Sequence, residues 1–138
     1  MAKTIVDAGP LIAFFRAADQ HHPWAAETFK TMRPPFFSTE PAITEAAHFL
    51  TASGISARCL LDWVETGDLK IPFQLTEQGG AVAGLMDKYR GRMDLTDATL
   101  VRLSELLGDC QILTIDYKDF SIYRRHGRQV VPLLTPPH

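Results

Sequence analysis

The segment Thr4-Ile5-Val6-Asp7 is a short β-branched run that ends in an aspartate. The segment Leu113-Thr114-Ile115-Asp116 repeats this pattern near the other end of the chain. Runs of this kind are typical of buried strands. In neighbouring parallel strands, about 4.8 Å apart, the two carboxylates would meet at the edge where open α/β sheets bind ligands. Each aspartate could instead simply cap the helix that follows it. The matched positions favour a shared site.

Strand patterns and helical patterns alternate along the whole chain. The expected strands are residues 4–6, 36–38, 69–73, 110–115 and 129–134, and helical segments lie between them, including one expected over residues 117–125. This alternation predicts a parallel sheet of five strands with helices on both faces, which is a three-layer α/β/α fold. Because proline cannot donate to a central ladder, Pro72 and Pro132 place the third and last strands at the edges of the sheet.

Composition sets broad limits on the kind of protein. The chain has 138 residues, 46% of them hydrophobic, which fits a single globular domain over residues 1–138. A formal net charge of −2 excludes nucleic-acid binding through overall positive charge, so any such contact requires a local basic patch. Only Cys59 and Cys110 are present, and neither a membrane span nor a signal peptide is recognisable. We therefore expect a cytoplasmic protein.

Asp97 is the most informative of the remaining acids. On a helical wheel it lies between Leu100 and Val101, on the side that faces the protein, where a carboxylate needs a hydrogen bond, an ion pair or a cation. The alternative is a capping arrangement in which Asp94 is the N-cap and Asp97 the third helical residue. Glu45 is a weaker candidate on spacing alone, because it lies opposite the apolar stripe of its helix.

If these carboxylates lie close together, their negative charges repel one another. Like charges at a shared site raise one another's pKa, and hard divalent cations such as Mg²⁺ resolve the conflict because they prefer oxygen ligands. Two such ions can support phosphodiester hydrolysis. The acidic residues therefore point to metal-dependent phosphoryl chemistry.

Four segments resemble the ordered acidic motifs of PIN-domain ribonucleases, and most closely those of VapC-type toxins from toxin–antitoxin pairs. They are Val6-Asp7, Thr44-Glu45, residues 93–98 and residues 113–120. The resemblance covers nearly the whole chain. It departs from the family pattern at Ala8-Gly9, where many relatives have Ser or Thr directly after the first aspartate.

The resemblance implies a PIN-like domain with sheet order 3-2-1-4-5 and a metal-dependent endoribonuclease activity. The residues that it implies as catalytic groups and as ligands of one or two Mg²⁺ or Mn²⁺ ions are Asp7, Glu45, Asp97 and Asp116. Thr114 and Asp119 match supporting positions, and Asp94 is expected to support the site as a helix cap. The resemblance further implies the toxin of a type II toxin–antitoxin system, a homodimer that is neutralised by a cognate antitoxin.

Two basic runs flank the acidic motifs and are candidates for binding RNA phosphates. Their cationic residues are Lys88, Arg90, Arg92, Arg124 and Arg125. The alternative is that these runs are solvated helix ends.

Two other functions compete with a nuclease. The same fold could serve as a non-catalytic RNA- or protein-binding regulatory module, although such a module has no need of four carboxylates. A receiver-type signalling domain is disfavoured, because the first strand ends in Asp7 without a second acid and the strand at residues 69–73 ends without an aspartate.

Overall fold

The computed structural model describes residues 2–138, and its centre is a sheet of five parallel strands in the order β3-β2-β1-β4-β7. The strands are β1 (Lys3–Val6), β2 (Phe36–Phe37), β3 (Leu69–Lys70), β4 (Cys110–Leu113) and β7 (Leu133–Leu134). The predicted order 3-2-1-4-5 is confirmed, because β7 is the fifth strand of this sheet along the chain.

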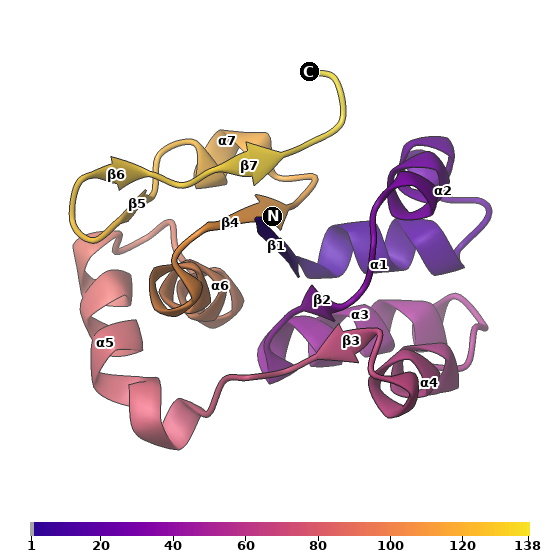
Figure 1. The fold of residues 1–138 in the computed structure, drawn as a ribbon, viewed down its shortest axis with the longest axis horizontal. Helices are drawn as coiled ribbons and strands as arrows, with labels where there is room; N and C mark the ends of the chain where they lie inside the picture. The colour runs from indigo at the N-terminus through magenta and orange to yellow at the C-terminus, as the bar shows by residue number, and fades with distance from the viewer. Residues whose placement is uncertain (1) are drawn as a thin grey trace.

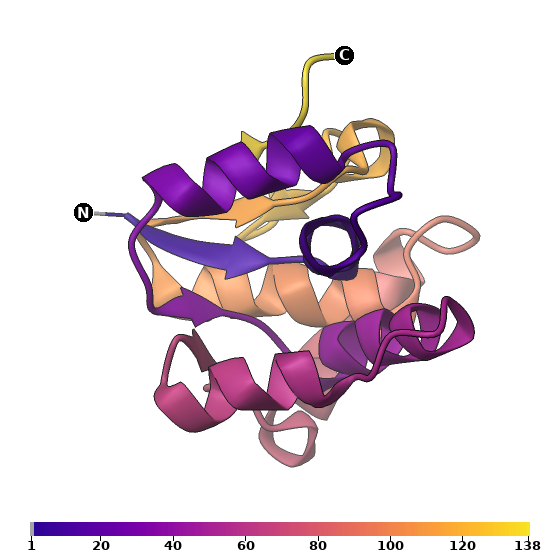
Figure 2. The same cartoon turned by 90° about the vertical axis from the view of Figure 1, so that its right-hand side faces the viewer.

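Helices cover both faces of the sheet, which confirms the three-layer α/β/α fold class (Figure 1 and Figure 2). They are α1 (Ala8–Phe15), α2 (His22–Thr31), α3 (Glu40–Ala52), α4 (Arg58–Thr66), α5 (Leu75–Lys88), α6 (Leu95–Leu107) and α7 (Tyr117–Phe120). In Figure 1, α5 and α6 lie on one side of the sheet, and α1 and α2 lie on the other. Within residues 2–138, no helix combines the length and the apolar character needed to cross a membrane.

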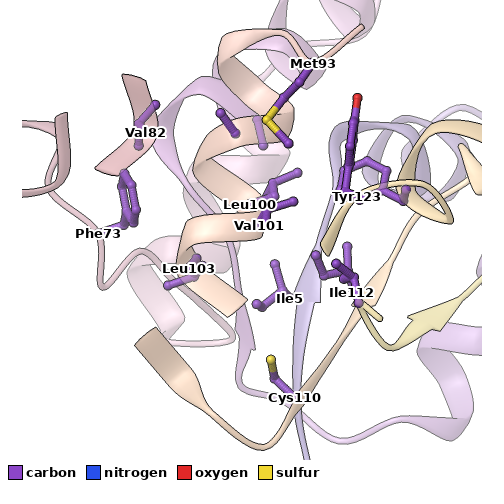
Figure 3. Close-up of a cluster of buried hydrophobic side chains, with 14 residues drawn as sticks. Ile5, Phe73, Val82, Met93, Leu100, Val101, Leu103, Cys110, Ile112 and Tyr123 are labelled. Carbon is purple, nitrogen blue, oxygen red and sulfur yellow. The ribbon is translucent and has the colours of Figure 1, made fainter. Parts of the chain in front are cut away.

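Side chains of the two central strands alternate between the two faces. Ile5 and Ile112 are paired across β1 and β4 and are buried in a cluster with residues of α5 and α6 (Figure 3). Val6 and Leu113 form the next pair and are buried in a second cluster with residues of α1, α2 and α4. A shift of one residue would turn every one of these side chains to the wrong face, so burial fixes the register.

The same register sets the ends of the two strands side by side. The backbone N–H of Asp7 donates to the Leu113 carbonyl at 2.9 Å, one residue beyond the last pair of the ladder. Thr114 continues β4 and donates its own N–H to the Leu134 carbonyl at 3.1 Å. The residues that follow β1 and β4 therefore emerge together at the carboxyl edge of the sheet.

The third and last strands lie at the edges of the sheet, as Pro72 and Pro132 predicted, but both strands are shorter than expected. β3 ends at Lys70, before Pro72. Pro132 precedes β7 and contributes only its carbonyl, which accepts from the Ile112 N–H at 2.8 Å. A residue without an N–H fits here, because only its carbonyl side meets the neighbouring strand.

The prediction of a helix over residues 117–125 is wrong beyond Phe120. Residues 124–125 form β5, which pairs antiparallel with β6 (Gln129–Val130), and we call this unit the β5–β6 hairpin. His126 and Gly127 both have positive φ, at 51° and 81°, which closes the three-residue turn. The expected strand over residues 129–134 is consequently two strands, because its first part pairs with β5 and its last part pairs with β4.

Candidate functional site

The acids singled out in the sequence come from different elements and face the carboxyl edge of the sheet. Asp7 follows β1 directly, Asp116 follows β4 after two residues, and Asp97 lies in the first turn of α6. The acidic side chain of Glu45 comes from α3. We call Asp7, Glu45, Asp97 and Asp116, together with Asp119 of α7, the acidic cluster.

Asp7 is buried, with 8% of its surface exposed, and both of its carboxylate oxygens accept hydrogen bonds. Oδ1 accepts from the Ala8 N–H at 2.7 Å, and Oδ2 accepts from the Thr114 hydroxyl at 2.8 Å. Burial raises the pKa of Asp7 to about 6, the negative charges of Glu45 and Asp116 add to this increase, and the two hydrogen bonds oppose it. The position thus costs free energy while the carboxylate is charged and no cation is present.

Thr114 links the ends of the two central strands. Its buried hydroxyl donates to Asp7 Oδ2 and also accepts the Asp116 N–H at 3.0 Å. One side chain therefore fixes both the carboxylate of Asp7 and the backbone of Asp116. This is the placement expected of a supporting residue.

Asp97 is half-buried and is held by Tyr123, whose hydroxyl donates to Asp97 Oδ2 at 2.7 Å. Burial is the main reason why the pKa of Asp97 rises to about 8, and the charges of Asp94, Asp7 and Asp116 raise it further. Asp94 is the N-cap of α6, because its Oδ1 accepts the Asp97 N–H at 2.8 Å. The prediction that Asp94 is the N-cap of this helix is confirmed. The Asp97 carboxylate takes no part in the cap and instead accepts from Tyr123.

Asp116 caps α7 and brings Asp119 to the cluster. Its Oδ1 accepts the Asp119 N–H at 2.9 Å, and burial raises its pKa, with Asp119 and Asp94 adding to the increase. Asp97, Asp116 and Asp119 each offer a carboxylate oxygen, and these atoms all lie within 4.8 Å of one another. The oxygens of three acids from the two helix starts thus lie around a common point.

Glu45 is the member of the acidic cluster that α3 contributes. It is half-buried, and its pKa is raised by burial and by the charge of Asp94, while its own charge raises the pKa of Asp7. It also lines a shallow groove of about 700 Å³ with Phe49, Leu75 and Leu95. The side chain is therefore near the site, although spacing alone suggested a solvated position.

Most groups that hold the acidic cluster are electrically neutral. They are the Thr114 and Tyr123 hydroxyls and the backbone N–H groups of Ala8 and Asp119. Among the described residues, Arg92 forms the one ion pair with the cluster, from its Nη1 to Asp119 Oδ1 at 2.7 Å. The remaining negative charge and the all-oxygen donor set fit a hard divalent cation, which would offset the repulsion that adds to the effect of burial on these pKa values.

The predicted RNA-binding cations lie in different environments. Arg92 adjoins the cluster, as described, and Arg90 is exposed beside Asp87 at 3.8 Å. Lys88 Nζ donates to the Gly127 carbonyl at 2.9 Å, so α5 and the β5–β6 hairpin meet here. Arg124 directs Nη1 to the carbonyls that precede it, at 2.8–3.1 Å.

Arg125, predicted as a cation for RNA phosphates, is instead buried and makes hydrogen bonds within the protein. Arg125 has only 6% of its surface exposed, and its Nη2 donates to the carbonyls of Ser104 and Gly108 at 2.6 and 2.7 Å. A guanidinium is favourable at the C-terminus of a helix, where carbonyls lack partners. Arg125 thus fastens the β5–β6 hairpin to the end of α6 that is remote from the acidic cluster.

Arg125→Met should lower the free energy of unfolding by about 2–4 kcal/mol, because the carbonyls of Ser104 and Gly108 lose a charged donor. Urea denaturation measures this loss. Arg128→Met, at an exposed position of the same hairpin, is the matched control and should change the free energy by no more than about 0.5 kcal/mol. Equal stability of the two variants would contradict the assigned anchoring role.

Tyr123 is the site residue that sequence reasoning missed. Its hydroxyl reaches a carboxylate 26 positions away in the chain, and its ring is fully buried. A tyrosine followed by two arginines carries no local signal of this contact, and the sequence pattern predicts helix over residues 117–125. Only the turn after Phe120 directs the side chain to α6.

Comparisons with known proteins bear on the fold. No protein-family model matches the chain, and no curated protein matches it. Among solved structures, a chain of a toxin–antitoxin complex from Klebsiella pneumoniae is similar, with a TM-score of 0.70 and 16% sequence identity over 99% of each chain. At this level of identity the likeness shows a shared fold over essentially the full length of both chains.

Proposed function

We propose that this chain is a Mg²⁺- or Mn²⁺-dependent endoribonuclease and the toxin component of a type II toxin–antitoxin pair. The observation that carries the proposal is the acidic cluster, in which carboxylate oxygens of Asp97, Asp116 and Asp119 lie within 4.8 Å of one another at the carboxyl edge of the sheet. Ligand sites of open α/β sheets lie at this edge. The family resemblance of the acidic motifs supports the same reaction.

Asp97 and Asp116 would hold the cation together with Asp7 and Glu45, and Asp119 would lie next to it. One or two such ions, when bound, lower the pKa of a water and stabilise the charge on the leaving oxygen of a phosphodiester. The chain itself contributes orientation. Thr114 and the Ala8 N–H fix the Asp7 carboxylate, and the Asp119 N–H fixes that of Asp116. No covalent intermediate with the protein is required.

Arg92 is the cation best placed to contact an RNA phosphate. Its ion pair with Asp119 holds the guanidinium at the margin of the acidic cluster, and its side chain is 40% exposed. Lys88, Arg90 and Arg124 would extend this positive margin along the RNA backbone. The acids alone would repel RNA, so substrate binding depends on these cations.

The proposed partner is a cognate antitoxin. The similar Klebsiella pneumoniae structure is a toxin–antitoxin complex, and an arginine-bearing antitoxin segment would complement the charge of the acidic cluster. We further propose that the chain acts as a homodimer in the cytoplasm. A regulatory module without catalytic activity would share the fold and the partner and would lack the cleavage reaction.

The test is the cleavage of a mixed RNA pool by the purified protein with Mn²⁺ or Mg²⁺. Wild type should cut, and both EDTA and Asp7→Asn should reduce the rate by at least about 100-fold, because each removes metal or one of its ligands. Calorimetry with Mn²⁺ alone, run in parallel, reports binding without an RNA substrate. If the wild-type protein neither cuts RNA nor binds Mn²⁺, the proposed enzyme is refuted and the regulatory module is favoured.

A further inference from the structure

Tyr123 extends from the core of the protein to the acidic cluster. Its ring is fully buried and makes edge-to-face contacts with Tyr89 and Phe120, at centroid distances of 5.1 and 5.2 Å. Figure 3 shows the ring beside the apolar core, with its hydroxyl directed away from Cys110, toward the end of α6 where Met93 lies. The packed ring therefore sets the position of the hydroxyl.

The hydroxyl has two acceptors within reach and is much closer to one. It lies 2.7 Å from Asp97 Oδ2 and 3.4 Å from the Arg92 carbonyl. Since a phenol has a single proton to donate, the shorter contact identifies Asp97 as its partner. The backbone carbonyl alone would have satisfied a buried tyrosine, so the contact with the carboxylate needs a separate explanation.

A neutral donor has a particular effect on this carboxylate. With Oδ2 held by the phenol, the plane of the Asp97 carboxylate is fixed while its negative charge remains available to a cation. Asp119 is different, because the guanidinium of Arg92 compensates its charge. Neutral groups that orient ligand carboxylates are a recurrent part of protein metal sites.

We propose that Tyr123 is a positioning residue that orients the Asp97 carboxylate toward a divalent cation bound in the acidic cluster. This role rests on the proposed function, since it assumes that the cluster binds Mg²⁺ or Mn²⁺. Tyr123 acts through Asp97 and does not itself contact the cation.

Tyr123→Phe removes the hydroxyl and keeps the packed ring, and Tyr89→Phe is the matched control. The Tyr89 hydroxyl accepts the Arg124 N–H at 2.9 Å, and its ring belongs to the same aromatic group. Calorimetric titration with Mn²⁺ should show a loss of affinity of about 10- to 100-fold for Tyr123→Phe and less than about threefold for Tyr89→Phe. In thermal unfolding without metal, the two substitutions should lower the Tm to a similar degree.

A double-mutant cycle separates positioning from general destabilisation. Adding Tyr123→Phe to Asp97→Asn should weaken Mn²⁺ binding by much less than Tyr123→Phe does in wild type, because its effect passes through Asp97. Three results would overturn the positioning role and leave the proposed function standing. They are wild-type Mn²⁺ affinity in Tyr123→Phe, equal losses of Mn²⁺ affinity in the two tyrosine variants, and a Tyr123→Phe protein that is unfolded while Tyr89→Phe is folded. Absence of Mn²⁺ binding by wild type would overturn both.

Discussion

Asp116→Asn should abolish metal-dependent RNA cleavage and leave the fold intact. A bound cation contributes several kcal/mol to the reaction and about 1.4 kcal/mol corresponds to a tenfold change in rate, so the expected loss is about a thousandfold or more. The fold should persist because Asp116 Oδ1 caps α7, and asparagine is an equally good N-cap. Since the substitution removes one of the repelling charges, the Tm without metal should be equal to or higher than that of wild type.

Asp109→Asn is the matched control for this prediction. Asp109 is exposed and lies just before β4, at the opposite end of the strand that Asp116 follows. Both substitutions remove one negative charge, and only Asp116→Asn removes a carboxylate of the acidic cluster. Cleavage assays and thermal melts are run on both proteins. Full activity of Asp116→Asn would exclude Asp116 from the reaction.

The metal-free protein should become less stable as the pH rises from about 5 to about 8. In the unfolded chain the carboxyl groups of Asp7 and Asp97 ionise near 3.8, whereas in the folded protein the pKa values are raised to about 6 and about 8. Over this range the folded state therefore holds protons that the unfolded state has released, and the free energy of unfolding falls with increasing pH. The two shifts together correspond to at most about 5 kcal/mol over this range, and solvent screening of the half-buried Asp97 reduces its share. Urea denaturation in EDTA at several pH values measures the decrease.

Asp97→Asn identifies the source of this pH dependence. The amide that replaces the carboxyl group cannot ionise, so the part of the decrease between about pH 6 and pH 8 should disappear, while Asp109→Asn should retain it. Saturating Mn²⁺ should stabilise wild type more at about pH 8 than at about pH 5, because the ligands must be deprotonated to bind. A stability that rises with pH in the metal-free wild type would contradict the inferred burial of these charges.

The central sheet and the location of the acids were predictable because each depends on local patterns that burial enforces. The two cleanest apolar runs form the central strands β1 and β4, and parallel strands bring their carboxyl ends to one edge. Asp7 follows β1 directly there, and Asp116 follows β4 after two residues. Asp97 followed from its position on the protein-facing side of α6. Glu45 did not follow from spacing, and only the family resemblance brought it forward.

The C-terminal part of the fold was not predictable in the same way. The run from Tyr117 to Arg125 has no glycine or proline that would end a helix, and its turn after Phe120 depends on tertiary contacts. The sequence presents Arg125 as a surface cation, because the carbonyls that it binds belong to residues 17 and 21 positions away, at the end of α6. Tyr123 was missed for the same reason, since its partner is also distant in the chain.

The segment 123–125 consequently restricts how the length of α6 can change during evolution. Tyr123 contacts the first turn of α6 through Asp97, and Arg125 contacts its last turn and the residue after it through Ser104 and Gly108. Inserting or deleting a residue in α6 would rotate one end by about 100° and shift it by about 1.5 Å, so one of the two contacts would be lost. Length variation should instead accumulate at the exposed turn of residues 126–128, which can accept an inserted peptide or a labelling tag without disturbing either contact.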